Sequence, residues 1–424
     1  MPIDPVETLR QLIQTPSVNP MGRPLTEPTH GESRLTELLQ SLCERQGWPW
    51  LRQQVHPGRE NLVAMVLGNP PPEGGGELLL WDVHQDTVPV EGMTIDPFGG
   101  EVRDGRVYGR GACDVKGSMA AMLAALSRVD EPSAVPSLQG REGERRPTIV
   151  IAFTANEECG FTGASALCDL WCATRQAGAE ITGGTISPAR LFPRPPVAAI
   201  VAEPTQFKIV IAHHGVVRWR CHTNGRAAHT SRPDTGVNAI YAMAQIVQAI
   251  ERYHTGLCAT APERPLCGRP SVCVSTFHGG VGINTVPERA TIEIDRRLGP
   301  EEQPGAAYDD LIRYVAANAN VGRCRVEHDP PFMQSSGLSD KYNGPFAERV
   351  AKLVQESGRR GELVGVPFGT DAAALSAAGV PTIVVGPGSI AQAHTADEFI
   401  EIDELRFATE VFHRIASSSL TDSG

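Results

Sequence analysis

Hydrophobic positions recur with two different periods along this chain of 424 residues. Apolar residues spaced three and four apart predict amphipathic helices over residues 6–13 and 35–42. Short apolar runs of strand length follow at residues 62–67, 78–83, 148–154 and 197–202. A helical pattern separates the second and third runs, which favours an α/β sheet with helices packed on it.

From about residue 209 the pattern changes to strand, helix, strand, strand, helix, strand. The predicted strands cover 209–223, 271–277, 290–296 and 323–328, and the predicted helices cover 237–253 and 306–317. This order is that of a ferredoxin-like βαββαβ unit, which can fold on its own sheet. The α/β pattern then returns with a helix at 345–356, a buried strand at 381–385 and a last helix from Asp403.

We therefore expect one two-piece domain with a second domain inserted into it. The first domain comprises residues 1–208 and 333–424, and the inserted domain comprises 209–332. Two stretches rich in Pro, Gly or charge, 131–147 and 173–196, are interpreted as surface insertions that the core does not need.

Composition excludes several classes of protein. The hydrophobic content of 41% and the charged content of 21% are typical of a well-packed globular chain. A formal net charge of -11 argues against a general nucleic-acid surface, which relies on Lys and Arg. The start of the sequence has no apolar signal region, and no stretch reaches the roughly 20 apolar residues of a membrane span. Ten cysteines without a repeated C-x-x-C frame are typical of reduced thiols, so we expect a cytoplasmic enzyme.

The stretch from residue 78 to 117 carries the first candidate chemistry. His84 and Asp86 stand at the polar end of an apolar run, and side chains two apart on a strand point the same way. The Asp86 carboxylate is therefore expected to accept the second N–H of the His84 imidazole, the usual support for a metal-bound histidine. Asp114 follows a Gly-containing turn and precedes an apolar-periodic segment, so by itself it is equally typical of a helix N-cap.

Further acids and a histidine stand at the ends of other predicted elements. Glu157 and Glu158 follow the apolar run that ends at Thr154, whereas Glu203 precedes a proline and His394 lies in a Gly-rich loop. Taken singly, these residues are typical of turns and surfaces. In a sheet covered by helices, however, functional groups gather where strands end. Two adjacent acids suit a division of labour in which one binds a metal and the other takes a proton from water.

The ligand types available here are nitrogen and carboxylate oxygen, which favour zinc or another divalent first-row ion over calcium.

Five strings give the sequence a resemblance to a known family. They are H-Q-D at 84–86, G-R-G-A-C-D-V-K-G at 109–117, N-E-E at 156–158, G-R-A-A-H-T-S-R-P-D-T-G-V-N-A-I at 225–240 and A-H-T at 393–395. In this order they resemble the co-catalytic zinc amidohydrolase and exopeptidase family. That family includes acetylornithine deacetylase, succinyl-diaminopimelate desuccinylase, aminoacylase and glutamate carboxypeptidase. The resemblance implies an α/β, zinc-exopeptidase-like catalytic domain, which has a mixed sheet with helices on both faces. It also implies that the ferredoxin-like βαββαβ insertion is a lid and dimerisation domain.

The resemblance also implies a metal centre with two divalent ions, zinc by expectation and cobalt as a substitute. The implied ligands are Asp114 as the bridge, His84 and Glu203 for one ion, and Glu158 and His394 for the other. Asp86 would stand behind His84, and Glu157 matches the general base of the family.

Residues of the predicted insertion are implied to act on the substrate. His229 matches a histidine that stabilises the oxyanion, commonly in the active site of a partner subunit, which implies a homodimer formed through the inserted domain. Asn284 and Arg297 match substrate-contacting positions, and Arg297 could grip a carboxylate, although Arg296 beside it is an alternative. Further along the chain, Gly369 and Thr370 resemble a loop that presents backbone donors to the same carboxylate.

The tail G-P-G-S-I-A-Q-A-H-T-A-D-E most resembles acetylornithine deacetylases. The expected function is therefore metal-dependent hydrolysis of an N-acyl amino acid, of the acetylornithine deacetylase or succinyl-diaminopimelate desuccinylase type. The substrate partner is a small molecule, with no nucleic acid and no membrane. Two alternatives remain at this point: a dipeptidase or carboxypeptidase of the same family, and a non-catalytic metabolite-binding protein on the same scaffold.

Overall fold

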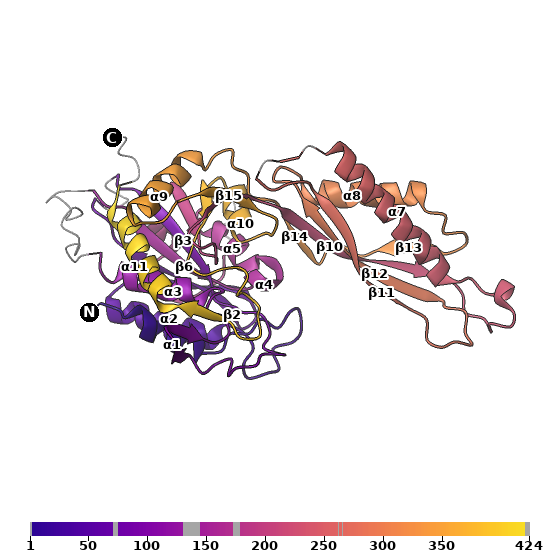
Figure 1. Cartoon of the computed structure of the whole chain (residues 1–424), viewed down its shortest axis with the longest axis horizontal. Helices are drawn as coiled ribbons and strands as arrows, with labels where there is room; N and C mark the ends of the chain where they lie inside the picture. Colours follow the sequence, from indigo (N-terminus) through magenta and orange to yellow (C-terminus); the bar gives the residue numbers. More distant parts are fainter. Residues whose placement is uncertain are drawn as a thin grey trace. The chain divides into compact units, whose positions relative to one another are not determined.

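The computed structural model describes residues 2–70, 75–129, 145–172, 179–261, 263–264 and 266–419. The chain divides into two compact units, which Figure 1 colours by sequence. Unit 1 comprises Met1–Ile211, Asp340–Val364 and Thr370–Gly424, and unit 2 comprises Ala212–Ser339 and Gly365–Gly369. Along the sequence, most of unit 2 thus lies between two parts of unit 1.

Unit 1 is built on a mixed sheet, which has nine strands within the described part of the chain. Its order is β15-β9-β16-β8-β3-β6-β2-β1-β7. The strands are β1 Trp50–His56, β2 Arg59–Val66, β3 Leu78–His84, β6 Thr148–Thr154, β7 Ile181–Gly184, β8 Ala198–Val201, β9 Ile209–His213, β15 Leu363–Val366 and β16 Thr382–Val384. At its centre β3 pairs in parallel with β6 and with β8, and β16 is parallel to β8. Every residue of β3 and β6 is buried, which explains why both are continuous apolar runs.

Helices cover both faces of this sheet (Figure 1). They are α1 Pro5–Ile13, α2 Ser33–Gln46, α3 Lys116–Leu126, α4 Glu157–Gly160, α5 Thr162–Leu167, α6 Pro188–Leu191, α9 Gly344–Glu356, α10 Ala372–Ala377 and α11 Ile402–Ser417, with a 3₁₀ turn at Cys168–Leu170. Trp81 of β3 packs on Phe412 of α11 with ring centroids 5.5 Å apart. The next residue, Asp82, points to the opposite face and meets Asp371 at the start of α10. The predicted fold class, a mixed α/β sheet with helices, is confirmed.

A small three-stranded sheet joins two distant parts of unit 1. Its strands are β4 Glu101–Arg103, β5 Arg106–Tyr108 and β17 Phe399–Glu401. Because β17 pairs antiparallel with β5, the segment before residue 399 lies beside the loop that follows Tyr108. This pairing brings the loop of Asp114 alongside the segment that contains His394.

Unit 2 has the ferredoxin-like order that the sequence predicts. It contains β10 Gly215–Asn224, a 3₁₀ turn at Pro233–Thr235, α7 Ala239–Thr260, β11 Ser271–Gly279, β12 Arg289–Leu298, α8 Pro304–Asn318, β13 Arg325–His328 and β14 Met333–Ser335. The strands follow the order β11-β12-β10-β13, and β14 also pairs with β10. One apolar core, which includes Trp219, Met243 and Leu311, lies between this sheet and the two helices. No helix in the described part of the chain combines the length and hydropathy of a bilayer-spanning segment.

The structure corrects two expectations about the chain's path. The predicted strand 209–223 is two strands, β9 in the sheet of unit 1 and β10 in that of unit 2. They separate at Gly215, where an added Cβ would lie 2.5 Å from the carbonyl oxygen of Ser335, so only glycine fits.

The predicted insertion 173–196 is also tied to the core. Residues 173–178 lie outside the described chain, as do 131–144 of the other insertion. Beyond residue 178, however, β7 pairs with β1 at the edge of the sheet, and Phe192 is buried against Trp171 with ring centroids 5.0 Å apart. The stretch is mostly exposed, but its anchoring contacts mean that the core does use it.

Candidate metal centre

The acidic and histidine residues of unit 1 meet at one edge of its sheet. Parallel strands β3, β6 and β8 end side by side, so the residues at or after their carboxyl ends emerge together. These residues are His84, Glu157, Glu158 and Glu203. Asp114 comes from the turn before α3, and His394 from the loop that follows β16.

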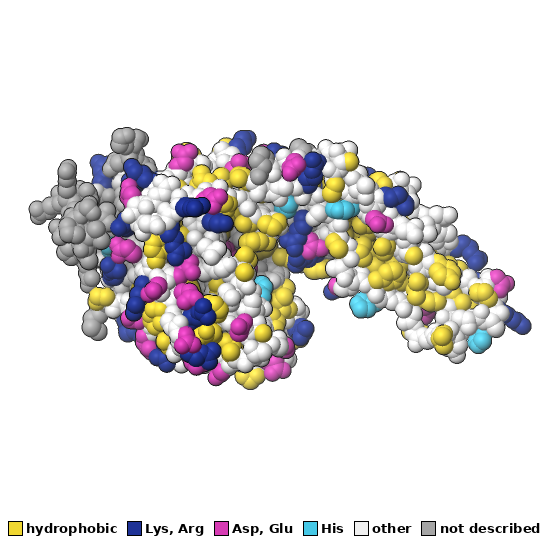
Figure 2. Space-filling model, viewed as in Figure 1, with side chains coloured by type: hydrophobic (Ala, Val, Ile, Leu, Met, Phe, Trp, Pro, Cys, Tyr) yellow, Lys and Arg dark blue, Asp and Glu magenta, His cyan; other side chains and the backbone are white. Residues whose placement is uncertain are grey.

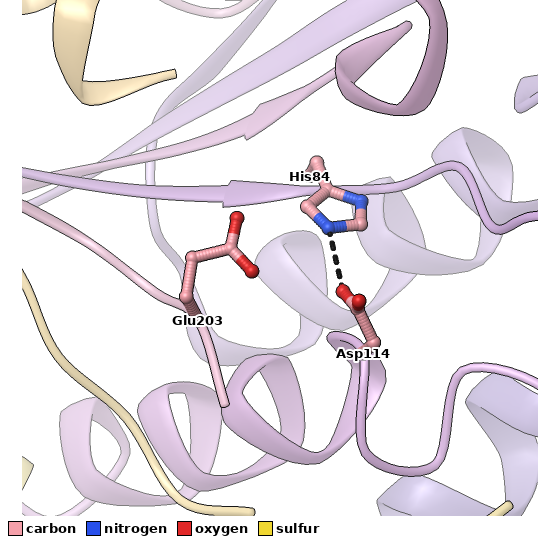
Figure 3. Close-up of side chains that lie close together, drawn as sticks. All are labelled: His84, Asp114 and Glu203. Atoms are coloured by element: carbon pink, nitrogen blue, oxygen red, sulfur yellow. Dashed lines mark hydrogen bonds and ion pairs between the residues drawn. The ribbon is translucent and has the colours of Figure 1, made fainter. Parts of the chain in front are cut away.

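Asp114 lies at the centre of this group. Its Oδ1 is 3.1 Å from Nε2 of His84, and its Oδ2 is 3.3 Å from Nε2 of His394. Figure 3 shows the carboxylates of Asp114 and Glu203 close to the His84 imidazole, each carried by a different stretch of the chain. The ligand atoms of His84, Asp114 and Glu203 lie within 4.8 Å of one another, and so do those of Asp114, Glu158 and His394. Two groups of three potential ligands therefore share one carboxylate.

The contact between His84 and Asp86 differs from the expected one. Nδ1 of His84 lies 2.8 Å from the backbone carbonyl oxygen of Asp86, whereas the Asp86 carboxylate is 3.8 Å away. That carboxylate accepts hydrogen bonds from the backbone N–H of Glu157 at 3.0 Å, the N–H of Glu158 at 3.1 Å and Nδ2 of Asn19 at 2.7 Å. Asp86 thus orients the two adjacent glutamates, and its carbonyl fixes the His84 proton on Nδ1. Nε2 is left with a lone pair for a metal.

Asn156 holds the turn that presents Glu157 and Glu158. It has a left-handed backbone with φ of 67°, a conformation that asparagine adopts more readily than most other non-glycine residues. Its side-chain Oδ1 accepts hydrogen bonds from Asn19 at 3.0 Å and from Arg59 at 2.9 Å. Its N–H donates to Oε1 of Glu32 at 3.2 Å. Asn19, Glu32 and Arg59 could not be predicted from the sequence, because no local pattern marks them.

The Glu32–Arg59 pair allows a test of stability. The pair is buried, and Arg59 donates hydrogen bonds from Nε and Nη2 to the two carboxylate oxygens. Glu32→Gln is expected to lower the free energy of unfolding by about 3–5 kcal/mol, because it leaves a buried guanidinium without its counter-charge. Urea denaturation measures this change. The control is Glu7→Gln, which removes an exposed partner of Arg10 and should cost less than about 1 kcal/mol. Equal losses of unfolding free energy in the two variants would contradict a stabilising role for the buried Glu32–Arg59 pair.

The pKa shifts of the site residues show that the site favours positive charge. Burial raises the pKa of Glu157 well above 4.5, and the charge of Glu203 raises it further. The pKa of Glu203 is likewise raised by burial and then by Asp114. Burial alone would lower the pKa of His84, but its hydrogen bond to Asp114 and the neighbouring acids raise it well above 6.5. Hydrogen bonds to Asp114 and Glu158 raise the pKa of His394 to about 10.

These shifts test whether the residues fit divalent cations. The pKa values of Glu157, Glu158 and Glu203 are raised, which favours retention of their protons. Burial alone would also raise the pKa of Asp114, but its hydrogen bonds to His394 and His84 lower it. The site therefore holds more acidic groups than its two histidines can balance. Divalent ions at the same position would displace those protons, as metal binding to such ligands does. The donor set, two imidazoles and two glutamates around one shared aspartate, fits first-row ions.

A second pair of buried acids, Asp82 and Asp371, lies near His84 and was not predicted. Thr154 donates to Asp82 at 2.8 Å and lies 3.1 Å from Asp371. Burial raises the pKa of Asp82 to about 7, and burial together with the charge of Asp82 raises that of Asp371. Asp82 shares a strand face with His84, so the alternation of β3 is the one sequence signal that could have pointed to it. Neither acid belongs to the two groups around Asp114.

The predicted catalytic residue His229 and the predicted substrate-binding residue Asn284 are neighbours within unit 2. The N–H of Thr230 donates to the carbonyl oxygen of Asn284 at 3.2 Å, and the N–H of Val286 donates to that of Ala228 at 2.8 Å. These two bonds place His229 opposite Thr285. The exposed His229 accepts a hydrogen bond at Nδ1 from the N–H of Ser231, 3.1 Å away. In neutral His229 the proton is therefore on Nε2.

The remaining predicted substrate-binding residues have different surroundings. Arg297 is half-buried and pairs with Asp295 at 2.8 Å, whereas Arg296 is fully buried with Glu302 at 2.7 Å. The more accessible of the two arginines is therefore Arg297. Gly369 belongs to unit 2 and Thr370 to unit 1. Thr370 is buried, and its Oγ1 accepts the N–H of Ala372 at 3.2 Å.

Comparison with known proteins identifies a family that this chain matches. The model of peptidase family M20/M25/M40 matches residues 80–418. The chain is 28% identical over 409 residues to the acetylornithine deacetylase of Photorhabdus laumondii, covering 94% of this chain and 92% of that protein.

Two solved structures share the fold. A metallo-carboxypeptidase of Sulfolobus solfataricus matches with a TM-score of 0.72 and 16% identity over 98% of both chains. A dinuclear metal-binding peptidase of Bacillus subtilis matches with a TM-score of 0.62 and 16% identity, covering 97% of this chain and 96% of that one. The family model covers most of the sequence and all five candidate metal ligands around Asp114. The chain therefore belongs to peptidase family M20/M25/M40 and is a hydrolase of amide bonds.

Proposed function

We propose that this chain removes the acyl group from an N-acyl amino acid at a centre of two divalent metal ions. The observation that carries the proposal is the pair of ligand groups that share Asp114. One ion would be held by His84, Asp114 and Glu203, and the other by Asp114, Glu158 and His394. Two such ions, zinc by expectation with cobalt as a substitute, would lower the pKa of a water molecule and polarise the acyl carbonyl.

Glu157 is proposed as the general base and acid. Its neighbour Glu158 takes part in a ligand group, while Glu157 belongs to neither. The Glu157 carboxylate takes a proton from the attacking water and later gives it to the nitrogen of the leaving amine. Burial raises the pKa of Glu157 above that of an ordinary carboxylic acid, which makes the carboxylate a stronger base toward the attacking water. The products are a short carboxylic acid and a free α-amino acid.

His229 is proposed to stabilise the oxyanion of the tetrahedral intermediate. The N–H of Ser231 fixes the tautomer, so Nε2–H is the donor that His229 can offer. A preorganised donor of this kind contributes about 10²–10³-fold to turnover. Asn284 and Arg297, with backbone donors at Gly369 and Thr370, are proposed to bind the substrate's carboxylate.

Unit 2 is proposed to form a homodimer. Large apolar side chains are exposed on it, with Tyr241 at 74%, Val281 at 92% and Ile283 at 99%, and Figure 2 shows hydrophobic side chains gathered on this unit. Strand β11 lies at the edge of its sheet, so its outer backbone groups can pair with another strand. A partner copy could then supply its His229 to the site of this chain.

A cytoplasmic location is proposed for the enzyme. All ten cysteines lie in the described part of the chain, and none of them forms a disulfide there. Free thiols persist in reducing compartments, which is the support for this location.

The substrate class can be tested with a small panel. Zinc-loaded and cobalt-loaded protein would be assayed with N-acetylornithine, N-succinyl-diaminopimelate and a dipeptide, with chelated protein as the control. The proposal predicts the highest kcat/KM for an N-acyl amino acid and loss of that activity after chelation. Preference for the dipeptide would make the protein a peptidase. Bound metal without hydrolysis of any acyl amino acid would favour a metabolite-binding protein instead.

A further inference from the structure

Glu398 connects the two segments that flank the metal centre from outside the main sheet. It lies four residues after His394 and directly before β17. Its side chain is completely buried, at 0% exposure. Its backbone carbonyl oxygen accepts the N–H of Gly109 at 3.0 Å, which continues the pairing of β17 with β5.

The Glu398 carboxylate is surrounded by donors from the turn that carries Asp114. Oε1 accepts the N–H of Cys113 at 2.9 Å and of Asp114 at 3.0 Å. Oε2 accepts the N–H of Gly111 at 3.0 Å and Nη1 of Arg110 at 2.6 Å. Successive backbone N–H groups that converge on one anion form a nest, and here the anion comes from a distant part of the same chain.

These donors belong to the turn that leads into helix α3, which begins at Lys116. The N-cap residue Val115 provides no side-chain hydrogen bond at that end of the helix. Among these contacts, the Glu398 carboxylate is the group that holds the turn ahead of the helix. Because Oε1 binds the N–H of Asp114 itself, the position of that aspartate depends directly on Glu398.

We propose that Glu398 is a positioning residue of the metal centre, which fixes Asp114 and His394 at the spacing that two cations need. The inference rests on the proposed function, because it concerns the same two ions. Asp114 faces both histidines through its two oxygens, so a shift of its backbone would disturb both ligand groups at once. A merely structural role would lower stability and leave the affinity for metal unchanged.

The test is a zinc titration of metal-free protein against a competing chelator. Wild-type protein is expected to bind two ions per chain. Glu398→Gln turns an amide N–H₂ toward a backbone N–H or the Arg110 guanidinium, and it is expected to weaken zinc binding about 10- to 100-fold, the usual effect of removing a contact that orients a ligand. The matched control is Glu404→Gln, which removes a carboxylate that pairs with Arg359 at 3.0 Å in the same unit. It should leave the zinc affinity unchanged.

The outcomes separate the inference from the proposed function. If folded Glu398→Gln protein binds zinc as tightly as wild type, the positioning role is overturned while the metal centre stands. If wild-type protein binds no zinc, the proposed metal centre is wrong, and the positioning role falls with it. Should circular dichroism show that Glu398→Gln is unfolded, Glu398→Asp takes its place. It keeps the charge but withdraws it by one methylene, and the same loss of affinity in the folded variant supports the role, whereas wild-type affinity overturns it.

Discussion

Glu157→Gln is expected to lower kcat by about 10²–10⁴-fold, the contribution typical of a general acid and base. The substitution keeps the size of the side chain but removes the group that accepts and returns the proton. Both ions should remain bound, because Glu157 belongs to neither ligand group around Asp114. A steady-state assay combined with metal analysis of the purified variant measures both quantities.

The neighbouring acid provides the control for this prediction. Glu158→Gln should lose turnover together with metal, because Glu158 shares a ligand group with Asp114 and His394. The two variants make the same substitution at adjacent positions, so each removes one carboxylate from the same turn. Wild-type turnover in Glu157→Gln, or loss of metal from it, would contradict the division of labour between the two glutamates.

Asp114→Asn is expected to abolish binding of both ions. An amide offers one neutral oxygen, and its N–H₂ would face one of the two histidines that now approach the carboxylate at 3.1 and 3.3 Å. The loss should be at least about 100-fold in metal affinity, since removal of contacts that only orient a ligand already costs 10- to 100-fold. Turnover should fall with it. Zinc titration and metal analysis give the stoichiometry.

Asp371→Asn is the matched control. Asp371 is also a fully buried acid of unit 1, but it pairs with Asp82 and belongs to neither ligand group. This variant should still bind two ions. If Asp114→Asn retained one ion at wild-type affinity, the shared carboxylate would not bridge the two sites.

Much of the fold follows from patterns that a sequence shows directly. Strands β3 and β6 are buried on both faces, so they appear as unbroken apolar runs whose ends can be recognised. The ferredoxin-like order of unit 2 follows from the alternation of helical and strand periods. The ligand candidates could be named because each directly follows such an element or belongs to a motif of the family.

Contacts between distant backbone groups could not be predicted in the same way. Nothing near Glu398 in the sequence shows that its carboxylate binds the N–H groups of the Asp114 turn, because that contact depends on how β17 pairs with β5. The role of Asp86 was misjudged for a related reason. Strand alternation gave the side on which it lies, but the competing backbone donors of Glu157 and Glu158 appear only once the chain has folded.

The most direct test of the metal centre is anomalous diffraction from crystals of the zinc-loaded protein. The account predicts two zinc peaks about 3.5–4 Å apart on either side of the Asp114 carboxylate. His84 and Glu203 should bind one ion, and Glu158 and His394 the other. A single peak, or zinc bound away from Asp114, would contradict a dinuclear hydrolase.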